Sequence, residues 1–319
     1  MGAESSQHHW FVAPPLDGPI TGGTLYNRFL AEALQALGDR VSVVSTVEAC
    51  EGFPWVDSLF LPQMQGSWGA VPAGLLVHYL PSVFEGLDTL ETFESEAFRG
   101  AATLMCTGAW MRDAVVRLGA EVERTALVEP GVHEVALVES VPAEPVVAVV
   151  VGTVTERKGM LPLLEALRRR APRVPWRLEI LGDLDADPAY ADACRRAAQG
   201  LPVRFRGALP PEQAREAVAA SHVLLSAASI ESYGMAIAEA QAHGVPVLAR
   251  RGGHVQQLVE RVSSGVVVDD VAALADAFGE MVDNPAALAE RRRFSQANRP
   301  RRSWLDAARE FRALSLSSS

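Results

Sequence analysis

The sequence predicts an α/β protein built from two Rossmann-like, doubly wound parallel-sheet domains. Near-continuous apolar runs, such as 146–151, alternate with amphipathic helical patterns, such as 160–170. This alternation is typical of parallel strands that are covered by helices on both faces. The chain has 319 residues, which exceeds the usual size of one domain. Two domains of ordinary size are therefore expected.

The distribution of charge supports the same division. Residues 1–144 hold 6 arginines and 19 acidic residues, whereas residues 145–319 hold 23 basic and 20 acidic residues. The change falls at the proline-containing segment 141–145, which is a credible linker. We predict a first domain over 1–144, a second domain over 145–300 and a carboxy-terminal helix over 301–319.

The first half predicts alternating strands and helices. An apolar run at 10–12 is followed by turn residues and a helix over 24–37 that ends at Gly38. Further strands are expected at 41–44, 75–79 and 103–106, with helices over 84–99 and 110–118. The segment 52–74 contains Trp55 and Trp68 and is rich in glycine and proline. It is interpreted equally well as an acceptor-side loop or as a packed surface loop.

The second half repeats the scheme. Strands are expected at 146–151, 176–181, 203–206, 222–225, 245–249 and 265–268. Helices are expected over 160–170, 189–198, 211–220, 234–242, 254–259 and 271–282. In open α/β sheets, ligands bind outside the carboxyl ends of the strands. The residues expected at such ends are Gly22, Gly23, Lys158, Gly182, Gly207 and Glu231.

Lys158 is the single lysine among 29 basic residues. It follows the strand 146–151 in a turn flanked by Gly152 and Gly159. Lysine is a compact charge on a flexible stem and suits a phosphate oxygen. By itself, the position is equally consistent with a surface lysine that has no function.

Two carboxylates, Glu231 and Glu239, flank the start of the helix expected at Gly234. Glu239 lies in an apolar run, where a carboxylate needs a partner. Sugar or ribose hydroxyls are suitable partners, and a structural ion pair is the alternative. Gly22 and Gly23 precede a helix, where backbone amides can approach an anion, although they can equally form only a permissive turn.

On these motifs the chain resembles the retaining glycosyltransferases of family 4. The resemblance implies the GT-B fold, in which two Rossmann-like domains face a central cleft and close about the linker. It also implies a nucleotide-sugar donor in the second domain and an acceptor in the first. The resembling segments are Gly22-Gly23, 128–132, 152–159, 181–183, 206–209, 231–239 and 244–247.

The resemblance assigns roles in the second domain. Lys158 would bind the donor diphosphate, and Arg157 beside it would supply charge, because Thr153 stands where many members have arginine. Gly182 lies in the resembling segment 181–183. Glu239 would accept hydrogen bonds from the ribose, and Glu231 would hold hexose hydroxyls. The base of the nucleotide would be lined by Gly207, Ala208 and Leu209. The phosphate would bind at the start of the helix, to the backbone amides of Ser232, Tyr233, Gly234 and Met235.

In the first domain, Gly22 and Gly23 would face the diphosphate. His78, at the end of the strand 75–79, resembles the family's active-site histidine near the donor sugar. A histidine on an apolar strand is otherwise most simply a core residue, so its role rests on the resemblance. The segment 227–230 and Gln256 depart from the family pattern, and they put the identity of the donor in doubt.

The predicted function is a retaining transfer of a hexose from a UDP- or GDP-sugar to a hydroxyl acceptor. No cofactor and no metal are required, because Lys158, Arg157 and the helix dipole can stabilise the diphosphate. The alternatives are a nucleotide-sugar 2-epimerase of the same fold and a non-catalytic nucleotide-sugar binding protein. The sequence does not specify the base, the sugar, the acceptor, the pathway or the oligomeric state.

Composition excludes other classes. A pI of about 5.3 and the lack of a strongly basic face disfavour nucleic acid binding. The helix expected over 24–37 has one arginine and no lysine, so membrane association is disfavoured. No apolar run is long enough to span a bilayer, and the acidic start lacks a signal core. We expect a cytoplasmic protein.

Overall fold

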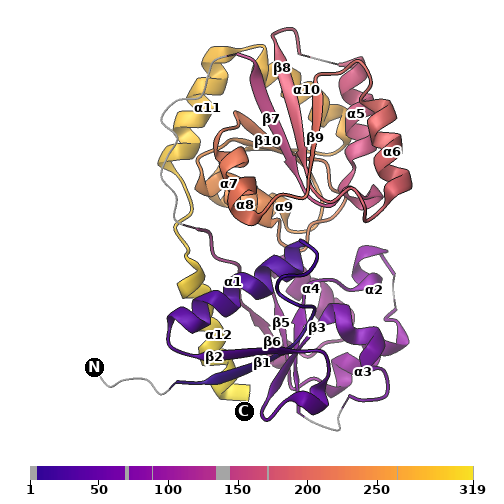
Figure 1. Ribbon diagram of the computed structural model, residues 1–319, viewed down its shortest axis with the longest axis vertical. Coiled ribbons are helices and arrows are strands. Elements are labelled where there is room, and N and C mark those ends of the chain that lie inside the picture. The colour runs from indigo at the N-terminus through magenta and orange to yellow at the C-terminus, as the bar shows by residue number, and fades with distance from the viewer. Residues whose placement is uncertain are drawn as a thin grey trace. The chain divides into compact units, whose positions relative to one another are not determined.

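The computed structural model describes residues 6–68, 72–87, 89–133, 144–170, 172–263 and 265–318, with side chains to 315. The chain forms two compact units (Figure 1). The first comprises Met1–Gly131 and Arg302–Ser319, and the second Val132–Arg301. The predicted boundary at 144/145 thus lies beyond the observed division at 131/132. Most of the predicted linker, at 141–143, falls outside the described residues.

In the first unit, the described residues form one parallel sheet with the order β2-β1-β3-β4-β5-β6. The order reverses between β1 and β3, so the chain leaves these two strands toward opposite faces, which is where a doubly wound sheet opens a crevice. The strands are β1 (His8–Val12), β2 (Arg40–Val44), β3 (Pro54–Asp57), β4 (Gly74–Val77), β5 (Thr103–Cys106) and β6 (Thr125–Leu127).

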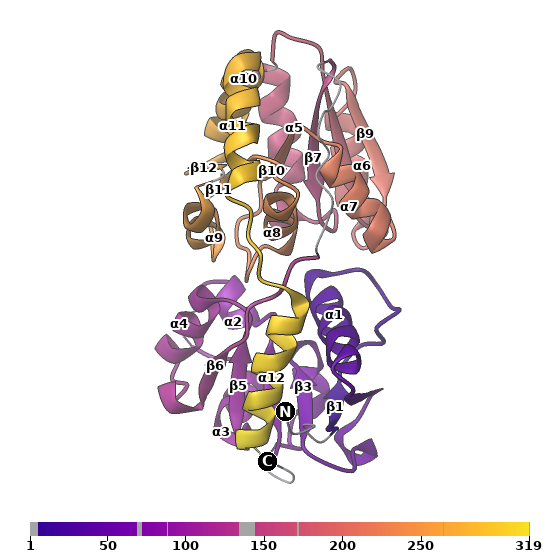
Figure 2. The same cartoon turned by 90° about the vertical axis from the view of Figure 1, so that its left-hand side faces the viewer.

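The helices of this unit cover both faces of the sheet. Apolar residues of α2, α3 and α4 pack against β4 and β5 in one cluster. On the other side, α12 packs along α1 (Figure 2). The helices are α1 (Gly22–Ala36), α2 (Pro81–Phe84), α3 (Thr92–Gly100), α4 (Ala109–Arg117) and α12 (Trp304–Ser318), with short 3-10 turns η1 (Val47–Ala49), η2 (Ser58–Met64) and η3 (Val122–Arg124).

The structure corrects the expected elements of the first half. Strands β3 and β6 were not predicted, because each is short and β3 begins at a proline. Trp55 lies in β3 with 1% of its surface exposed, so the segment 52–74 is not simply a loop. The expected helix 84–99 begins only at Thr92, as α3, because α2 ends at Phe84 and Gly86 has φ 68°, a conformation that favours glycine.

In the second unit, the described residues form a parallel sheet with the order β12-β11-β10-β7-β8-β9. This is the Rossmann order, and it reverses between β7 and β10. Every strand predicted in this half is present within about two residues. The strands are β7 (Val146–Val151), β8 (Trp176–Leu181), β9 (Val203–Gly207), β10 (Val223–Ser226), β11 (Val247–Arg250) and β12 (Gly265–Val268).

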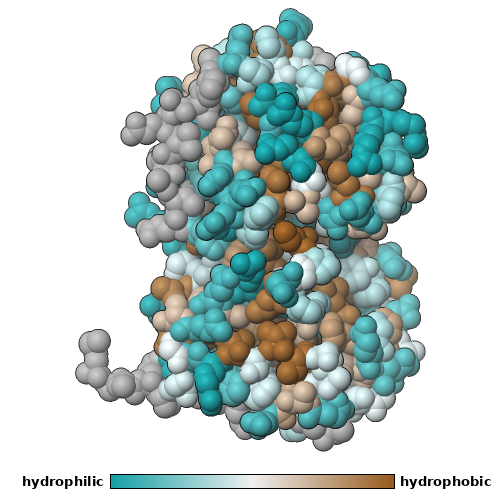
Figure 3. Space-filling model, viewed as in Figure 1, coloured by the Kyte–Doolittle hydropathy of each residue, from teal (hydrophilic) through white to brown (hydrophobic). Residues whose placement is uncertain are grey.

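The helices of the second unit turn apolar faces to two buried clusters on either side of its sheet. Hydrophilic residues cover the outer side of α6 (Figure 3). The arginines at 291–293 were expected on a solvated helix face, and they lie in α11, whose bounds were not predicted. The helices are η4 (Glu156–Lys158), α5 (Met160–Arg169), α6 (Pro188–Ala197), α7 (Pro211–Ala219), α8 (Met235–Ala242), α9 (Val255–Val262), α10 (Val271–Val282) and α11 (Pro285–Ala297).

Candidate functional site

Lys158 and Glu231 meet at the reversal point of the second sheet. Lys158 lies on η4 after β7, and Glu231 lies in the loop after β10, which pairs with β7. The Lys158 Nζ atom is 2.6 Å from Glu231 Oε1, and the two side chains are 20% and 17% exposed. Two residues singled out separately in the sequence therefore form one partly buried ion pair.

The two loops that carry this pair are joined by their backbones. Gly159 has φ 67°, and a Cβ atom there would clash with the carbonyl oxygen of Ala227. Ser229 donates from its backbone N–H and from its hydroxyl to the carbonyl oxygen of Arg157, at 3.0 and 3.2 Å. The Arg157 side chain itself is exposed. The position of Lys158 is thus set by a close backbone approach that only glycine permits.

Gly182 and Gly207 shape the neighbouring strand ends. The Gly182 N–H donates to the carbonyl oxygen of Gly207 at 2.9 Å, and a Cβ atom on Gly182 would clash with the carbonyl oxygen of Gly152. The aliphatic part of the Lys158 side chain passes over Gly152. Its Cε atom lies 3.3 Å from the position that a Cβ atom on Gly152 would occupy. These glycines let the strand ends pack closely beneath the lysine, while Thr153 beside them is partly exposed.

The start of α8 carries both buried and partly exposed residues. Gly234 caps the helix at φ 101°, and Tyr233 is 6% exposed and stacks on the ring of His254 at 5.2 Å. Ser232 and Met235 are partly exposed. The Tyr233 side chain therefore belongs to the core, and only its backbone remains a candidate for contact with a ligand.

Glu239 lies one turn into α8, near Arg215 of α7. Its side chain is partly exposed, but burial raises its pKa to about 7, against a smaller lowering by the charge of Arg215. Such a carboxyl gains by accepting hydrogen bonds from a ligand. Ala208 is exposed, and Leu209 packs on the cluster that contains α8.

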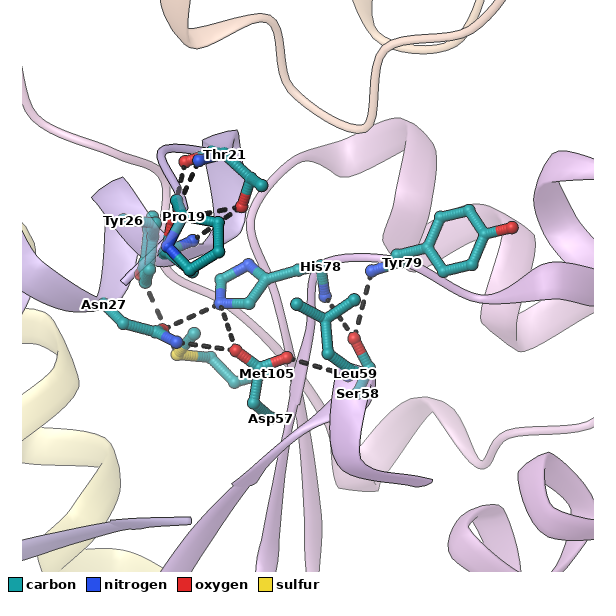
Figure 4. A network of polar contacts seen from close by, with 11 residues as sticks. Pro19, Thr21, Tyr26, Asn27, Asp57, Ser58, Leu59, His78, Tyr79 and Met105 are labelled. Atoms are coloured by element: carbon teal, nitrogen blue, oxygen red, sulfur yellow. Dashed lines mark hydrogen bonds and ion pairs between the residues drawn. The ribbon is translucent and has the colours of Figure 1, made fainter. Parts of the chain in front are cut away.

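In the first unit, His78 follows β4 and is 7% exposed. Its Nε2 atom is 2.8 Å from Asn27 Oδ1, and Asn27 Nδ2 donates to Asp57 Oδ2 at 2.6 Å (Figure 4). Burial lowers the pKa of His78, against a smaller raising by the charge of Asp57. The imidazole is therefore neutral near pH 7 and has one donor and one acceptor nitrogen.

Gly23 lies against the ring of His78. A Cβ atom at Gly23 would be 3.3 Å from both Cβ and Cγ of His78, whereas one at Gly22 would meet nothing within 4 Å. Thr21 caps α1 and forms a capping box with Thr24. The amides of Gly22 and Gly23 belong to the first turn, where N–H groups lack a helical acceptor.

Three residues near these clusters were missed in the sequence. Asp57 ends the unpredicted strand β3, so nothing marked it as a strand-end carboxylate. Asn27 was assigned to a helix without a role, and Arg215 approaches Glu239 only because α7 packs on α8. Correct prediction of β3 would have revealed Asp57, whereas the other two depend on packing between elements.

A separate cavity of about 470 Å³ lies near the starts of β7 and β8. Both arginines that line it pair with Glu179, Arg177 at 3.1 Å and Arg206 at 2.7 Å. Among the described residues, no cluster of three or more His, Cys, Asp or Glu side chains could hold a metal ion. Within the same part of the chain, no helix is long and apolar enough to cross a membrane.

A family model described as glycosyl transferases group 1 matches residues 145–284. The matched residues lie in the second unit. The D-inositol 3-phosphate glycosyltransferase of Corynebacterium urealyticum is 31% identical over 214 residues, which are 63% of this chain and 50% of that protein. Its counterpart from Pseudarthrobacter chlorophenolicus is 28% identical over 284 residues, 78% of this chain and 66% of that protein. The chain thus spans between half and two thirds of these relatives.

Solved structures show the fold of the whole chain. The sucrose-phosphate synthase from Thermosynechococcus elongatus has a TM-score of 0.78 at 18% identity, covering 98% of this chain and 99% of that one. The Anabaena protein HepE, solved with UDP and glucose, has a TM-score of 0.76 at 16% identity, covering 99% and 100%. The predicted fold class and family resemblance are confirmed: the fold is GT-B.

Proposed function

We propose that this protein is a retaining glycosyltransferase that moves a hexose from a nucleotide diphosphate sugar to a hydroxyl acceptor. The observation that carries the proposal is the ion pair of Lys158 and Glu231 at the reversal point of a Rossmann-ordered sheet. A cation and a carboxylate there match the two parts of such a donor. The cation suits the diphosphate, and the carboxylate accepts hydrogen bonds from the hexose hydroxyls.

The chemistry follows from where charge develops. As the bond between the anomeric carbon and the diphosphate oxygen breaks, negative charge builds on the leaving diphosphate. Lys158, the neighbouring Arg157 and the amides at the start of α8 are fixed positive groups that stabilise this charge. We propose that these groups suffice without a metal ion. The acceptor hydroxyl forms the new bond to the anomeric carbon and releases its proton.

The nucleotide is assigned to Glu239 and to the segment 207–209. The raised pKa of Glu239 supports a carboxyl that is stabilised by ribose hydroxyls. UDP is the first nucleotide to test, because HepE was solved with UDP and with UDP-glucose. GDP is the second. The cytoplasmic location expected from the sequence stays a prediction.

The acceptor is proposed only as a hydroxyl compound. The names of the two relatives put D-inositol 3-phosphate among the acceptors to test. The acidic composition of residues 1–144 instead favours a neutral or weakly anionic acceptor. A panel that contains D-inositol 3-phosphate, free inositol and neutral sugars distinguishes these two expectations.

The first experiment is a thermal-shift screen with UDP, GDP and ADP and their hexose conjugates. Stabilisation by one nucleotide series is expected, because a ligand that binds only the folded state raises the melting temperature. The preferred donor is then incubated with the acceptor panel, with and without EDTA. Transfer with retained anomeric configuration in EDTA supports the proposal.

Two results would contradict it. Conversion of the donor to an epimer without acceptor indicates a 2-epimerase. Tight donor binding with neither transfer nor slow hydrolysis indicates a binding protein.

A further inference from the structure

The side chains of Asp57, Asn27 and His78 form a buried chain of polar contacts in the first unit (Figure 4). Asp57 and Asn27 are fully buried, and His78 is 7% exposed. They come from the end of β3, the second turn of α1 and the end of β4. Buried polar groups of this kind are costly unless each donor faces an acceptor, so the geometry restricts which atom carries each proton.

The carboxylate of Asp57 orients the amide of Asn27. Asp57 Oδ1 accepts from the backbone N–H of Leu59 at 2.8 Å. Asp57 Oδ2 lies 2.6 Å from the Asn27 amide. An ionised carboxylate only accepts hydrogen bonds, so the atom of Asn27 that faces it is the NH₂ group. The amide oxygen is thereby turned toward His78.

The amide of Asn27 then determines the proton on His78. The Nε2 atom lies 2.8 Å from an oxygen that can only accept, so Nε2 carries the proton. Its distance of 3.8 Å to Asp57 Oδ2 is too long for a hydrogen bond. In a neutral imidazole the other nitrogen is an acceptor. Figure 4 shows that Nδ1 lies on the side of the ring away from Asn27 and Asp57.

The orientation of the ring is fixed as well. Ser58 Oγ accepts the backbone N–H groups of His78 and Tyr79, each at 3.0 Å. The Tyr26 ring lies 5.1 Å from the imidazole, and Gly23 packs against it. Two adjacent residues thus hold His78: Ser58, at the start of η2, holds its backbone, and Asp57, at the end of β3, acts on its proton through Asn27.

We propose that Asp57 is a positioning residue that acts through Asn27 to hold His78 as the Nε2–H tautomer, so that Nδ1 accepts a hydrogen bond from a substrate hydroxyl. The use of Nδ1 rests on the proposed glycosyl transfer. The tautomer itself does not. A partner on one ring nitrogen commonly decides which nitrogen of a histidine is available for function.

The experiment is long-range ¹H–¹⁵N NMR of the full chain labelled at histidine, which distinguishes the two tautomers of a neutral imidazole. His78→Gln identifies the signals of His78 among the 7 histidines. We expect a pure Nε2–H tautomer in the unaltered protein. An Nδ1–H tautomer there would overturn the proposal, whatever any variant does.

The variant Asp57→Asn keeps the size of the side chain but replaces an acceptor-only group by one that also donates. We expect Asn27 to populate both orientations and His78 to become a mixture of tautomers. We expect kcat to fall at least about 10-fold, with the donor KM changed by less than about 2-fold. The matched control is Asp113→Asn on α4, whose side chain is 52% exposed, and it should change neither the spectrum nor kcat.

The outcomes separate this inference from the proposed function. A tautomer that stays pure in Asp57→Asn overturns the positioning role. A mixed tautomer with unchanged kcat overturns the use of Nδ1 in the reaction. If no transferase activity is found but the tautomer mixes, the proposed function fails while the role of Asp57 stands. If Asp57→Asn does not fold, the same NMR measurement is made on Asn27→Ser, which lacks the amide oxygen that faces Nε2 of His78.

Discussion

Lys158 Nζ lies 2.6 Å from Glu231 Oε1, although the two residues are 73 positions apart in the sequence. The contact exists because β7 and β10 are neighbours at the reversal of the strand order. Since Glu231 balances the charge of the ammonium, the lysine is held in place by a partner before the proposed diphosphate binds. Preorganisation of this kind is what stabilisation of a developing charge requires.

The first prediction concerns this lysine. Lys158→Ala should lower kcat/KM by about 10²-fold, as for the loss of one fixed group that stabilises transition-state charge. Arg157→Ala should lower kcat/KM by less than Lys158→Ala does, because the Arg157 side chain is exposed and water screens its charge. The measurement is steady-state kinetics with the preferred donor.

A matched control removes a positive charge elsewhere in the same unit. Arg169 is 75% exposed, so Arg169→Ala should leave kcat/KM within about 2-fold, as expected for a solvated helix face. Near-normal turnover in Lys158→Ala would remove the diphosphate role of this residue.

The second prediction concerns the pH dependence of Glu239. Its pKa is raised from 4.5 to about 7 in the folded protein. Between these values the folded state binds more protons than the unfolded state, so the free energy of unfolding falls as pH rises and levels off above about 7. The loss is up to about 3 kcal/mol, and Glu239→Gln should abolish it in urea denaturation measured from pH 5 to 8.

The affinity for the nucleotide should rise with pH, whereas the free energy of unfolding falls. The ionised carboxylate accepts ribose hydroxyls better than the protonated form, so UDP affinity should rise by up to about 10-fold from pH 6 to 8. Calorimetry on Glu239→Gln provides the reference that subtracts the titration of the nucleotide itself. The same pH profile in both proteins would argue against the ribose contact.

The third prediction concerns Gly159. Gly159→Ala places a Cβ atom against the carbonyl oxygen of Ala227 at φ 67°, and it should lower the free energy of unfolding by about 2–4 kcal/mol. Gly200→Ala is the matched control, since Gly200 has φ 80° but nothing within 4 Å. That control should lose only about 1 kcal/mol, the cost of the backbone conformation.

Hydrogen exchange read peptide by peptide assigns the loss to the second unit. If both glycine variants lose the same free energy of unfolding, the close approach of Gly159 to Ala227 does not contribute to the cost of the Gly159→Ala substitution.

The fourth prediction concerns the attachment of α12 to the first unit. Phe311 is fully buried and contacts the rings of Phe11 and Trp55 at 5.6 and 5.0 Å. Arg312 Nε lies 3.2 Å from the buried carboxylate of Asp39. Phe311→Ala should destabilise the first unit by about 3–5 kcal/mol in urea denaturation.

The control is another phenylalanine late in the chain. Phe294 is 45% exposed, so Phe294→Ala should cost less than about 1 kcal/mol. If the two variants unfold at the same urea concentration, α12 does not contribute to the core of the first unit.

Most of the second unit could be predicted, because its strands are continuous apolar runs and its helices have amphipathic patterns. The first unit was harder to predict. Strand β3 has four residues and begins at Pro54, so its local signal is weak, and Asp57 at its end was missed with it. The bounds of helix α11 were not predicted, because its polar, arginine-rich sequence indicates a solvated helix face but lacks a clear apolar stripe.

The sequence by itself determined the alternation of strands and helices, the family motifs and the placement of Lys158, Glu231 and His78 at strand ends. These depend on local patterns of burial and on turn residues. Only the tertiary structure decided which strand ends are neighbours, and hence that Lys158 meets Glu231 and that Asp57 reaches His78 through Asn27. The reason is physical: periodicity encodes which face of an element is buried, whereas strand order and helix packing are set by contacts between distant segments.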